Sequence, residues 1–174
     1  MATPQAGEEV AVLQTNLGRI VLRFLSDKAP NHVARFKENV RSGGYDGTKF
    51  HRVIPGFMVQ GGDPNSKTGD GPVGTGGLGS PLRAEFNDTK HVRGILSAAR
   101  SSDPHSARSQ FFLMVATSPH LDGQYTAYGE VIEGMDVVDK IVALPRDSRD
   151  KPLPPNEAVV VKATIEAYEG ATGA

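Results

Sequence analysis

The order of β-rich and helical patterns along the chain constrains its fold more than any other feature of the sequence. Residues 9–25 hold two β-rich runs that flank Asn16, Leu17 and Gly18, which predicts a hairpin. Further short strands are predicted at residues 49–54, 57–61, 94–99, 110–115, 127–132 and 158–168. Only two helical patterns accompany these strands, so the sequence does not alternate in β-α-β units. We therefore predict a mainly β fold, a closed or nearly closed antiparallel barrel whose open ends are covered by two helices.

Both predicted helices are amphipathic. The first lies within residues 29–44, where Pro30 suits the first helical position and Gly43 can end the helix. The apolar faces of the two helices consist of Val33, Phe36 and Val40 and of Met135, Val138 and Ile141. Alternation predicts inward strand faces formed by Ile20, Leu22 and Phe24, and by Val159, Val161, Ala163 and Ile165.

Size and composition narrow the possible classes of protein. A chain of 174 residues with 38% apolar residues suits one domain, assigned to residues 1–174 with a core at 10–168 and short disordered tails. The 19 basic and 20 acidic residues nearly cancel, which gives no electrostatic reason to expect nucleic acid or a membrane as a partner. No apolar run could span a bilayer and no secretory signal is visible, so we expect a cytoplasmic protein. Cysteine is absent, which excludes disulfides and thiolate chemistry.

The glycine-rich run from Gly69 to Gly79 raises the question of nucleotide binding, because it matches the pattern G-x-G-x-x-G in two overlapping frames. Phosphate-binding loops of this pattern connect a buried strand to the first turn of a helix. The residues before and after this run, Pro81 among them, predict neither element. We therefore predict a long surface loop, whose length suggests a functional one.

The stretch KFHRVIPGFMVQGGD places an arginine beside apolar residues. Alternation predicts that Phe50, Arg52 and Ile54 share one face and that Met58 and Gln60 share another. Farther along, the strand SQFFLMV is apolar on both of its faces. Only one of these faces can point into a barrel, so the other must line a second apolar surface. The arginine and this surface together predict a shallow binding groove.

The blocks FHRVIPGFMVQGGD, GILSAARS, SQFF and LDG, in this order and at these separations, resemble the cyclophilin family of peptidyl-prolyl cis-trans isomerases. The resemblance extends from about Val10 to Tyr168, and SPHLDGQYTAYGEV is similar to the bacterial cytosolic branch. It implies an eight-stranded antiparallel barrel capped by two α-helices. It also implies an isomerase, without cofactor or metal, that acts on Xaa-Pro bonds in unfolded or flexible segments and assists protein folding.

The resemblance assigns roles to individual residues. Arg52 matches the catalytic arginine, with Gln60 expected to orient it and Phe57 beside it. The residues expected to bind substrate around the proline are Met58, Ala99, Arg100, Ser101, Gln110, Phe112, His120, Leu121 and Tyr125. Gly74 and Thr75 are expected to border a second pocket near Ser101, so the glycine-rich loop either selects residues N-terminal to the proline or is a solvent loop without a role in selection.

Three positions differ from the best-known eukaryotic cytosolic members, which carry Asn, Trp and His where this chain has Arg100, His120 and Tyr125. Tyr125 can still supply an aromatic wall. In the family that tryptophan donates a hydrogen bond to cyclosporin, so His120 implies weakened binding of the drug.

The expected chemistry needs no nucleophile, because rotation about an Xaa-Pro bond breaks only the resonance of the amide. A guanidinium that hydrogen-bonds to the amide nitrogen favours the twisted state, and Arg52 is the candidate for this role. The second hypothesis is a binding module that recognises proline-containing segments and whose catalytic rate is incidental. Under either hypothesis we expect a monomer. The histidines show no metal-ligand spacing, and His51 is expected to make a structural hydrogen bond.

Overall fold

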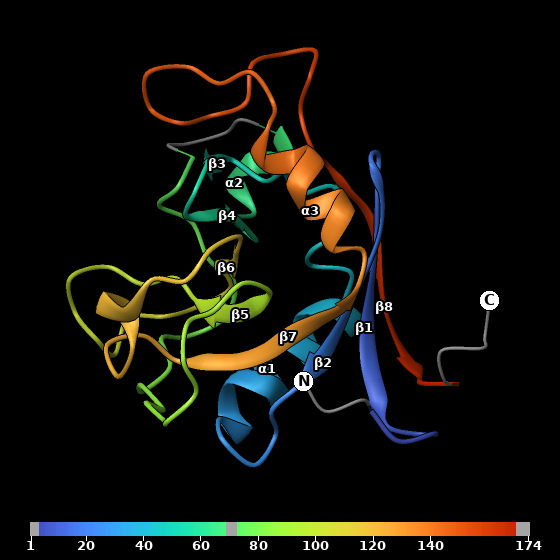
Figure 1. Ribbon diagram of the computed structural model, residues 1–174, viewed down its shortest axis with the longest axis vertical. Helices are drawn as coiled ribbons and strands as arrows, with labels where there is room; N and C mark the ends of the chain where they lie inside the picture. The colour runs from blue at the N-terminus through green and yellow to red at the C-terminus, as the bar shows by residue number, and fades with distance from the viewer. Residues whose placement is uncertain (1–3, 69–72, 170–174) are drawn as a thin grey trace.

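The computed structural model describes residues 4–68 and 73–169. Gly69 and Gly71 of the glycine-rich run, and the tail after residue 169, lie outside the described residues. Within these described ranges the chain forms eight strands (Figure 1). They are β1 (Glu9–Thr15), β2 (Gly18–Phe24), β3 (Arg52–Ile54), β4 (Met58–Gly61), β5 (Ile95–Ala98), β6 (Phe111–Met114), β7 (Ala127–Glu133) and β8 (Val160–Ala167).

The strands form one sheet in the order β3-β4-β6-β5-β7-β2-β1-β8, and every neighbouring pair is antiparallel. The sheet curves into a half-barrel around a common core (Figure 1). Its edges, β3 and β8, do not pair strand to strand within the described residues. An isolated bridge joins Lys49 to Val159, and the Phe50 N–H donates to the Ala158 carbonyl at 3.0 Å. The predicted mainly β, eight-stranded antiparallel architecture is therefore confirmed, and full closure is not.

The hairpin predicted near the N-terminus is formed by β1 and β2. Thr15 pairs with Gly18 across the turn, and Gly18 has a φ of 140°. The predicted inward face of β2 is confirmed, because Ile20, Leu22 and Phe24 all belong to the core.

The predicted inward face of the last strand is wrong at its beginning. Val161 is 59% exposed, whereas the preceding Val160 is buried. Thr15 of β1 pairs with Val160 while Gln14 pairs with Lys162, so β8 carries one extra residue here. Such a β-bulge reverses the alternation of the side chains. Alternation alone could not predict it.

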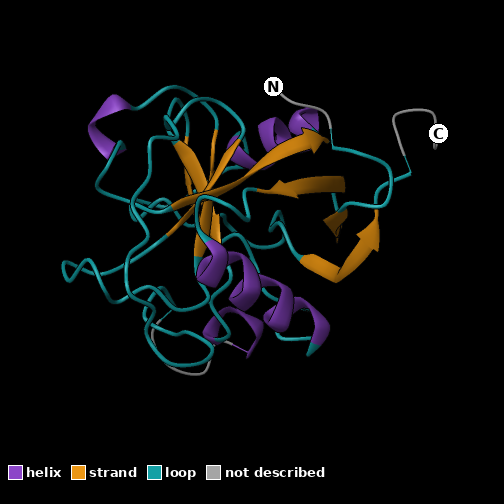
Figure 2. Cartoon of the chain, turned by 90° about the horizontal axis from the view of Figure 1, so that it is seen from below, coloured by secondary structure: helices purple, strands orange, loops and turns teal. Residues whose placement is uncertain are grey.

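Two helices lie at opposite ends of the half-barrel (Figures 1 and 2). The helix α1 (Pro30–Arg41) has proline in its first turn and ends just before Gly43, whose φ is 77°. It contacts β7 and β8, whereas α3 (Met135–Val142) contacts β2, β3 and β4. Both helices were predicted. Two shorter segments were not, the helix α2 (Asn65–Thr68) and a 3₁₀ turn at Pro119–Leu121.

Phe36 joins α1 to the centre of the core. Its ring centroid lies 5.6 Å from that of Phe24, 4.9 Å from Tyr45, 5.5 Å from Phe111 and 5.9 Å from Tyr128. Tilted and edge-to-face pairs of this kind stabilise a fold beyond their buried area. One aromatic cluster therefore fixes the helix to three strands that are distant in the sequence.

The strand β6 is apolar on both faces, as predicted. Phe111 and Leu113 belong to the core, whereas Phe112 and Met114 belong to a second buried cluster with Met58. The other buried members of the second cluster are Ile95, Leu121 and Ala127. The second cluster lies on the opposite face of β4 and β6 from the core, and it forms the floor of the candidate site.

Candidate active site

The strands β3 and β4 form a tight hairpin that places Arg52 opposite Gln60. The turn is closed by the Phe57 N–H, which donates to the Ile54 carbonyl at 3.0 Å. Gly56 in this turn has a φ of 76°, a conformation that favours glycine. The hairpin therefore fixes the base of the Arg52 side chain beside the second cluster.

The prediction that Phe50 shares a face with Arg52 is wrong. The strand β3 begins only at Arg52, so the alternation does not extend back to Phe50. Phe50 belongs to the core, where its ring lies 6.0 Å from that of Phe111. Ile54, in contrast, packs against the second cluster.

A pocket of about 120 Å³ opens over the second cluster. We call it the first pocket. Its lining consists of Arg52, Phe57, Met58, Gln60, Ala99, Arg100, Phe112, Leu121 and Tyr125. All nine residues had been singled out in the sequence, from four separate blocks. The fold brings these blocks together because β4, β6 and β5 are neighbours in the sheet.

A chain of hydrogen bonds leads from the arginine to the glycine-rich loop. Arg52 donates from Nη1 to Gln60 Oε1 at 3.3 Å, which confirms Gln60 as its partner. Gln60 Nε2 donates to Gln110 Oε1 at 2.9 Å, and Gln110 Nε2 donates to the carbonyls of Gly74 and Gly76 at 3.0 and 2.8 Å. We call this chain the glutamine relay. It orients the guanidinium and uses only one of its five N–H donors.

Aromatic rings form one wall of the first pocket. Phe112 and Tyr125 meet edge to face with their centroids 5.7 Å apart, and the Arg100 guanidinium lies 4.4 Å from the centre of the Tyr125 ring. Arg100 is held there by two hydrogen bonds from its guanidinium to the Gln124 carbonyl, at 3.1 and 2.8 Å. Tyr125 and Arg100 therefore form a rigid pair at the pocket's edge.

His120 lines neither the first pocket nor the second pocket that adjoins it, which is described below. The 3₁₀ turn carries its ring to 6.0 Å from that of Phe57, and the side chain is exposed. Of the residues singled out in the sequence, it is the one that the fold leaves at the margin of the site.

A second pocket of about 180 Å³ adjoins the first and shares Gln60, Ala99 and Arg100 with it. Its remaining lining consists of Gly74, Thr75, Gly76, Ser101, Ser106, Arg108 and Gln110. Gly76, Ser106 and Arg108 were missed in the sequence. Ser106 and Arg108 lie in the loop between β5 and β6, where no periodic pattern indicates which side chains face the groove.

The glycine-rich loop is anchored beside the second pocket by Asp63, which is fully buried. The Gly74 N–H donates to the Asp63 carboxylate, and a methyl group on Gly76 would collide with that carboxylate. Gly74 also has a φ of 99°. The glycines therefore permit a close approach of the backbone to a buried carboxylate. No helix begins within residues 73–94, so this part of the glycine-rich run does not lead into a helix.

Behind Phe112 lies a polar network centred on His91. The His91 ring stacks on Phe112 with centroids 6.1 Å apart. Its Nδ1 lies 3.2 Å from Asp122 Oδ1 and its Nε2 lies 2.8 Å from Ser97 Oγ. Burial lowers the pKa of His91, and the Asp122 carboxylate opposes this shift. The neutral ring therefore supports the pocket wall near neutral pH.

We expect the free energy of unfolding to fall as the pH drops below about 6.5, the pKa of histidine in an unfolded chain. Burial lowers the pKa of His32, His51 and His91 in the folded protein. The unfolded state therefore binds more protons in this range, and each histidine that stays neutral contributes a loss of up to about 1.4 kcal/mol per pH unit.

Urea unfolding at pH 7.5, 6.5 and 5.5 measures this effect, and NMR titration of the three Hε1 signals identifies the groups. A free energy of unfolding that stayed constant or rose toward pH 5.5 would contradict the assignment.

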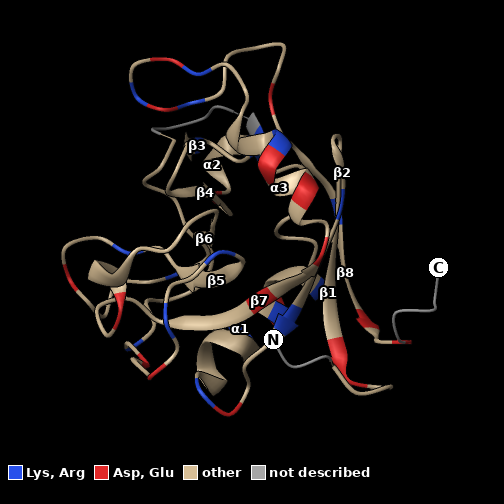
Figure 3. Ribbon diagram, viewed as in Figure 1, with Lys and Arg blue, Asp and Glu red and all other residues tan. Residues whose placement is uncertain are grey.

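The part of the chain that the structure describes holds no group of three or more His, Asp or Glu side chains able to bind a metal ion. None of its helices combines the length and apolar character needed to cross a membrane. Basic and acidic residues are interspersed along the ribbon (Figure 3), in agreement with a formal net charge of −1.

Comparison with known proteins agrees with this architecture. A family model described as cyclophilin type peptidyl-prolyl cis-trans isomerase/CLD matches residues 10–165. A probable peptidyl-prolyl cis-trans isomerase of Brucella abortus is 45% identical over 166 residues, which covers 92% of this chain and 84% of the relative. The peptidyl-prolyl cis-trans isomerase ppi1 of Schizosaccharomyces pombe is 40% identical over 145 residues, covering 82% of this chain and 91% of the relative.

Solved structures show the same fold. A Cryptosporidium parvum cyclophilin type peptidyl-prolyl cis-trans isomerase, crystallised in the presence of the dipeptide Ala-Pro, matches with a TM-score of 0.83 and 30% identity. The match covers 91% of this chain and 99% of that one. The cyclophilin AquaCyp293 from Hirschia baltica matches with a TM-score of 0.75 and 28% identity, covering 91% of this chain and 74% of that one. The protein belongs to the cyclophilin family of peptidyl-prolyl cis-trans isomerases.

Proposed function

We propose that this peptidyl-prolyl cis-trans isomerase holds the substrate proline in the first pocket while the Arg52 guanidinium stabilises the twisted amide. One observation carries the proposal: a guanidinium lines an apolar pocket and is oriented by the hydrogen bond that it donates to Gln60. The remaining N–H donors of Arg52 are available to the nitrogen of an amide bound over Phe112.

The energetics indicate that Arg52 does not act alone. Rotation about the amide faces a barrier of about 18–20 kcal/mol, and a rate gain of about 10⁵ requires about 7 kcal/mol of differential stabilisation. One charge-assisted hydrogen bond contributes about 1.5–3 kcal/mol. The remainder comes from holding the proline ring against Phe57, Met58, Phe112 and Leu121 while the other side of the amide turns.

The proposed substrates are Xaa-Pro bonds in unfolded or flexible segments. The first pocket, at about 120 Å³, lies below the usual range of about 300–1,000 Å³ for drug-sized ligands and suits a single side chain. The use of Ala-Pro with the Cryptosporidium parvum relative supports a proline-containing ligand for the same pocket.

Assistance to folding is tested with a protein whose slow refolding phase is limited by proline isomerisation, a process of tens to hundreds of seconds. We expect catalytic amounts of this chain to accelerate that phase and to leave its amplitude unchanged. An unchanged rate of the slow phase at stoichiometric amounts would contradict a folding role.

The second pocket is proposed to bind residues N-terminal to the proline, through Gly74, Thr75 and Ser101. Within their described linings, the two pockets hold Arg52, Arg100 and Arg108 and no carboxylate. Arg108 Nε donates to the Gly79 carbonyl at 2.8 Å, which fixes its position at the second pocket. The groove is therefore electrostatically suited to acidic peptides.

We expect kcat/KM to decrease from Glu to Gln to Lys at one position N-terminal to the proline in otherwise identical peptides. Exposed ion pairs contribute about 0.2–1 kcal/mol, so each step is about 1.4- to 5-fold. The ratio of Glu to Gln should shrink in high salt and in Arg108→Gln. Equal ratios in the parent and in Arg108→Gln would exclude this role of Arg108.

A binding module that recognises proline-containing segments is the second candidate. It is favoured by the second pocket, which at about 180 Å³ extends the groove beyond what rotation of one amide requires. Affinity and exchange rate, measured on the same peptide, separate the two functions.

Finer features of the fold and setting also belong to the proposal. We infer that the barrel closes between the segment before β3 and the start of β8, supported by the Val160 N–H that donates to the Thr48 carbonyl at 2.8 Å. We also infer that residues 10–168 form a single domain.

We further propose that the protein is a monomer, which sedimentation tests, and that it is cytoplasmic, which cell fractionation tests. Weakened cyclosporin binding, inferred from His120, is tested by calorimetry.

A further inference from the structure

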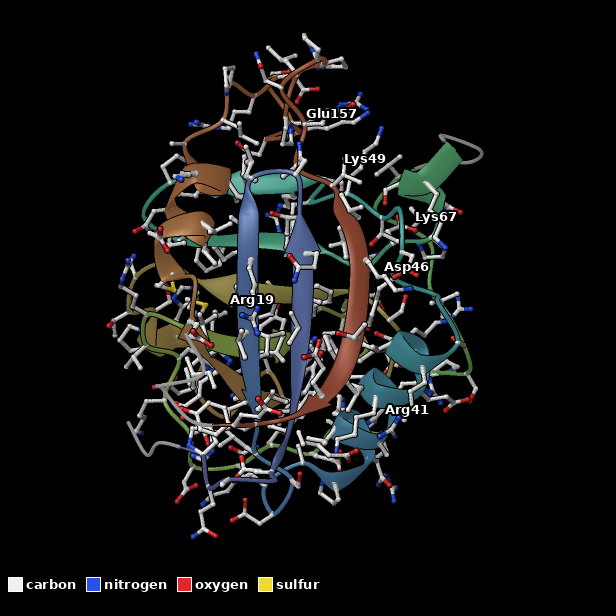
Figure 4. All side chains as sticks on the ribbon, turned by 90° about the vertical axis from the view of Figure 1, so that its right-hand side faces the viewer. Arg19, Arg41, Asp46, Lys49, Lys67 and Glu157 are labelled. Carbon is white, nitrogen blue, oxygen red and sulfur yellow. The ribbon has the colours of Figure 1, made fainter. Side chains whose placement is uncertain are left out.

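A third cavity lies outside the groove, on the other side of the segment that leads into β3. Its volume is about 140 Å³, which suits a small ion or a single chemical group better than a drug-sized ligand. We call it the lysine pocket. Its lining consists of Lys49, Phe50, His51, Ser66, Lys67, Val73, Lys151, Pro152 and Glu157. It is built by the segment before β3, the helix α2 and the loop before β8, and Figure 4 shows Lys49, Glu157 and Lys67 on the same side of the molecule.

The charges that line this pocket are not balanced. Lys49 Nζ lies 3.2 Å from both carboxylate oxygens of Glu157, so these two charges compensate each other. The ammonium groups of Lys67 and Lys151 form no hydrogen bond or ion pair with residues 4–68 and 73–169. The nearby Asp147, whose pKa is lowered by two backbone N–H donors and then by Lys151, does not line the pocket. Among the described residues, two positive charges in the lining therefore have no ion-pair partner at contact distance.

His51 supplies a second, independent observation. Its side chain is 8% exposed, and neither ring nitrogen has a hydrogen-bond partner among the described residues. The structural hydrogen bond expected of His51 is therefore not formed with ordinary geometry, although the Lys49 backbone and the Gln110 side chain lie near enough to oppose the lowering of its pKa by burial. The Cδ2–Nε2 edge of the ring lies next to Gly74, 4.0 Å from the position of a methyl group there. A buried imidazole without a partner is rare, because its desolvation is not compensated.

We propose that the lysine pocket binds a phosphate group, either inorganic phosphate or the phosphate of a phosphorylated side chain. A phosphate monoester carries a charge of about −1.5 to −2 at pH 7, which matches the two ammonium groups that form no ion pair with the described residues. A carboxylate would neutralise only one of them. Lysine is a common phosphate ligand as a point charge, and the His51 ring can add one N–H donor.

The site is separate from the proline pocket but adjacent to its supports. His51 directly precedes Arg52, and its ring lies beneath Gly74, whose carbonyl accepts a hydrogen bond from Gln110 of the glutamine relay. Phosphate in the lysine pocket is therefore expected to perturb NMR signals of His51, Arg52 and Gly74 whether or not the chain catalyses isomerisation.

The test is an NMR titration of the full chain at pH 7 and constant ionic strength, with inorganic phosphate and with a phosphoserine peptide in separate arms. We expect saturable shifts at Lys49, His51 and Lys67 in at least one arm. The arm with the tighter binding identifies the source of the phosphate. Sodium chloride at matched ionic strength controls for general screening.

The decisive variant is Lys67→Gln combined with Lys151→Gln, which should weaken phosphate binding at least tenfold. The matched control is Lys28→Gln combined with Lys140→Gln, which removes the same charge outside the pocket and should leave the affinity unchanged within twofold. Spectra of both variants without phosphate show whether the fold is kept. Shifts that do not saturate in either arm, or equal weakening in both double variants, would overturn the proposal.

Discussion

Replacing Arg52 by alanine should lower kcat/KM for an Xaa-Pro peptide by roughly 10- to 150-fold. This range corresponds to the loss of about 1.5–3 kcal/mol from one charge-assisted hydrogen bond in the transition state. The loss should appear in kcat more than in peptide affinity, because the apolar pocket that holds the proline is retained. Arg52 is exposed and its guanidinium forms a single hydrogen bond, to Gln60, within the described residues, so the variant should fold normally.

Two variants control this experiment. Arg52→Lys keeps the charge but loses the planar fork of donors, so it should recover only part of the rate. Arg19→Ala removes the same side chain from β2, on the face shown in Figure 4 and away from both pockets, and should leave the rate unchanged. A loss below twofold in a folded Arg52→Ala protein would remove Arg52 from the mechanism.

Replacing Phe36 by alanine should lower the free energy of unfolding by about 3–5 kcal/mol. The Phe36 side chain is 1% exposed and contacts four aromatic rings, so its removal leaves a cavity where α1 meets the sheet. For a chain of this size, that loss corresponds to a decrease in Tm of about 6–20 °C. Urea and thermal unfolding measure both quantities.

Val161→Ala is the matched control for a lost apolar side chain. Val161 is 59% exposed, so the change should stay within about 0.5 kcal/mol. The result that contradicts the packing described here is a Phe36→Ala protein destabilised by less than about 1.5 kcal/mol, because that value would indicate a core able to collapse around the missing ring.

The elements that could be predicted from the sequence are those whose local pattern is complete in itself. Pro30, the apolar spacing that includes Phe36, and Gly43 together define α1 without reference to the rest of the chain. The hairpin of β1 and β2 is similarly local. The bulge that exposes Val161 could not be predicted, because it depends on how β8 aligns with β1. The same limit explains Phe50, whose direction is decided by where β3 begins.

The candidate site was predictable where its residues lie in strands or in the distinctive blocks around them. Alternation in β6 separated Phe112 from Phe111 and so indicated an apolar surface outside the core. Arg108 and Ser106 were missed because they lie in a loop without periodicity. The lack of a well-formed hydrogen bond at the His51 ring could not be foreseen either, since hydrogen bonding depends on neighbours from distant segments of the chain.

Scaffold and site are linked through the strands that they share. The residues of β6 alternate between the core and the floor of the first pocket, so packing around Phe36 and Phe111 also fixes the position of Phe112. The His91 ring supports Phe112 from behind. A pocket built in this way is preorganised, which is the condition for catalysis by positioning rather than by covalent chemistry.

The most direct test of the central claim is the cis-to-trans exchange rate of a short Xaa-Pro peptide, measured by NMR exchange spectroscopy at equilibrium with and without the protein. Uncatalysed exchange takes tens to hundreds of seconds, so catalysis is visible against a slow background. We expect catalytic amounts of protein to bring exchange into the range of milliseconds to seconds without changing the cis-to-trans ratio. Saturable binding of the peptide with exchange at its uncatalysed rate would contradict the claim and establish the groove as a recognition surface.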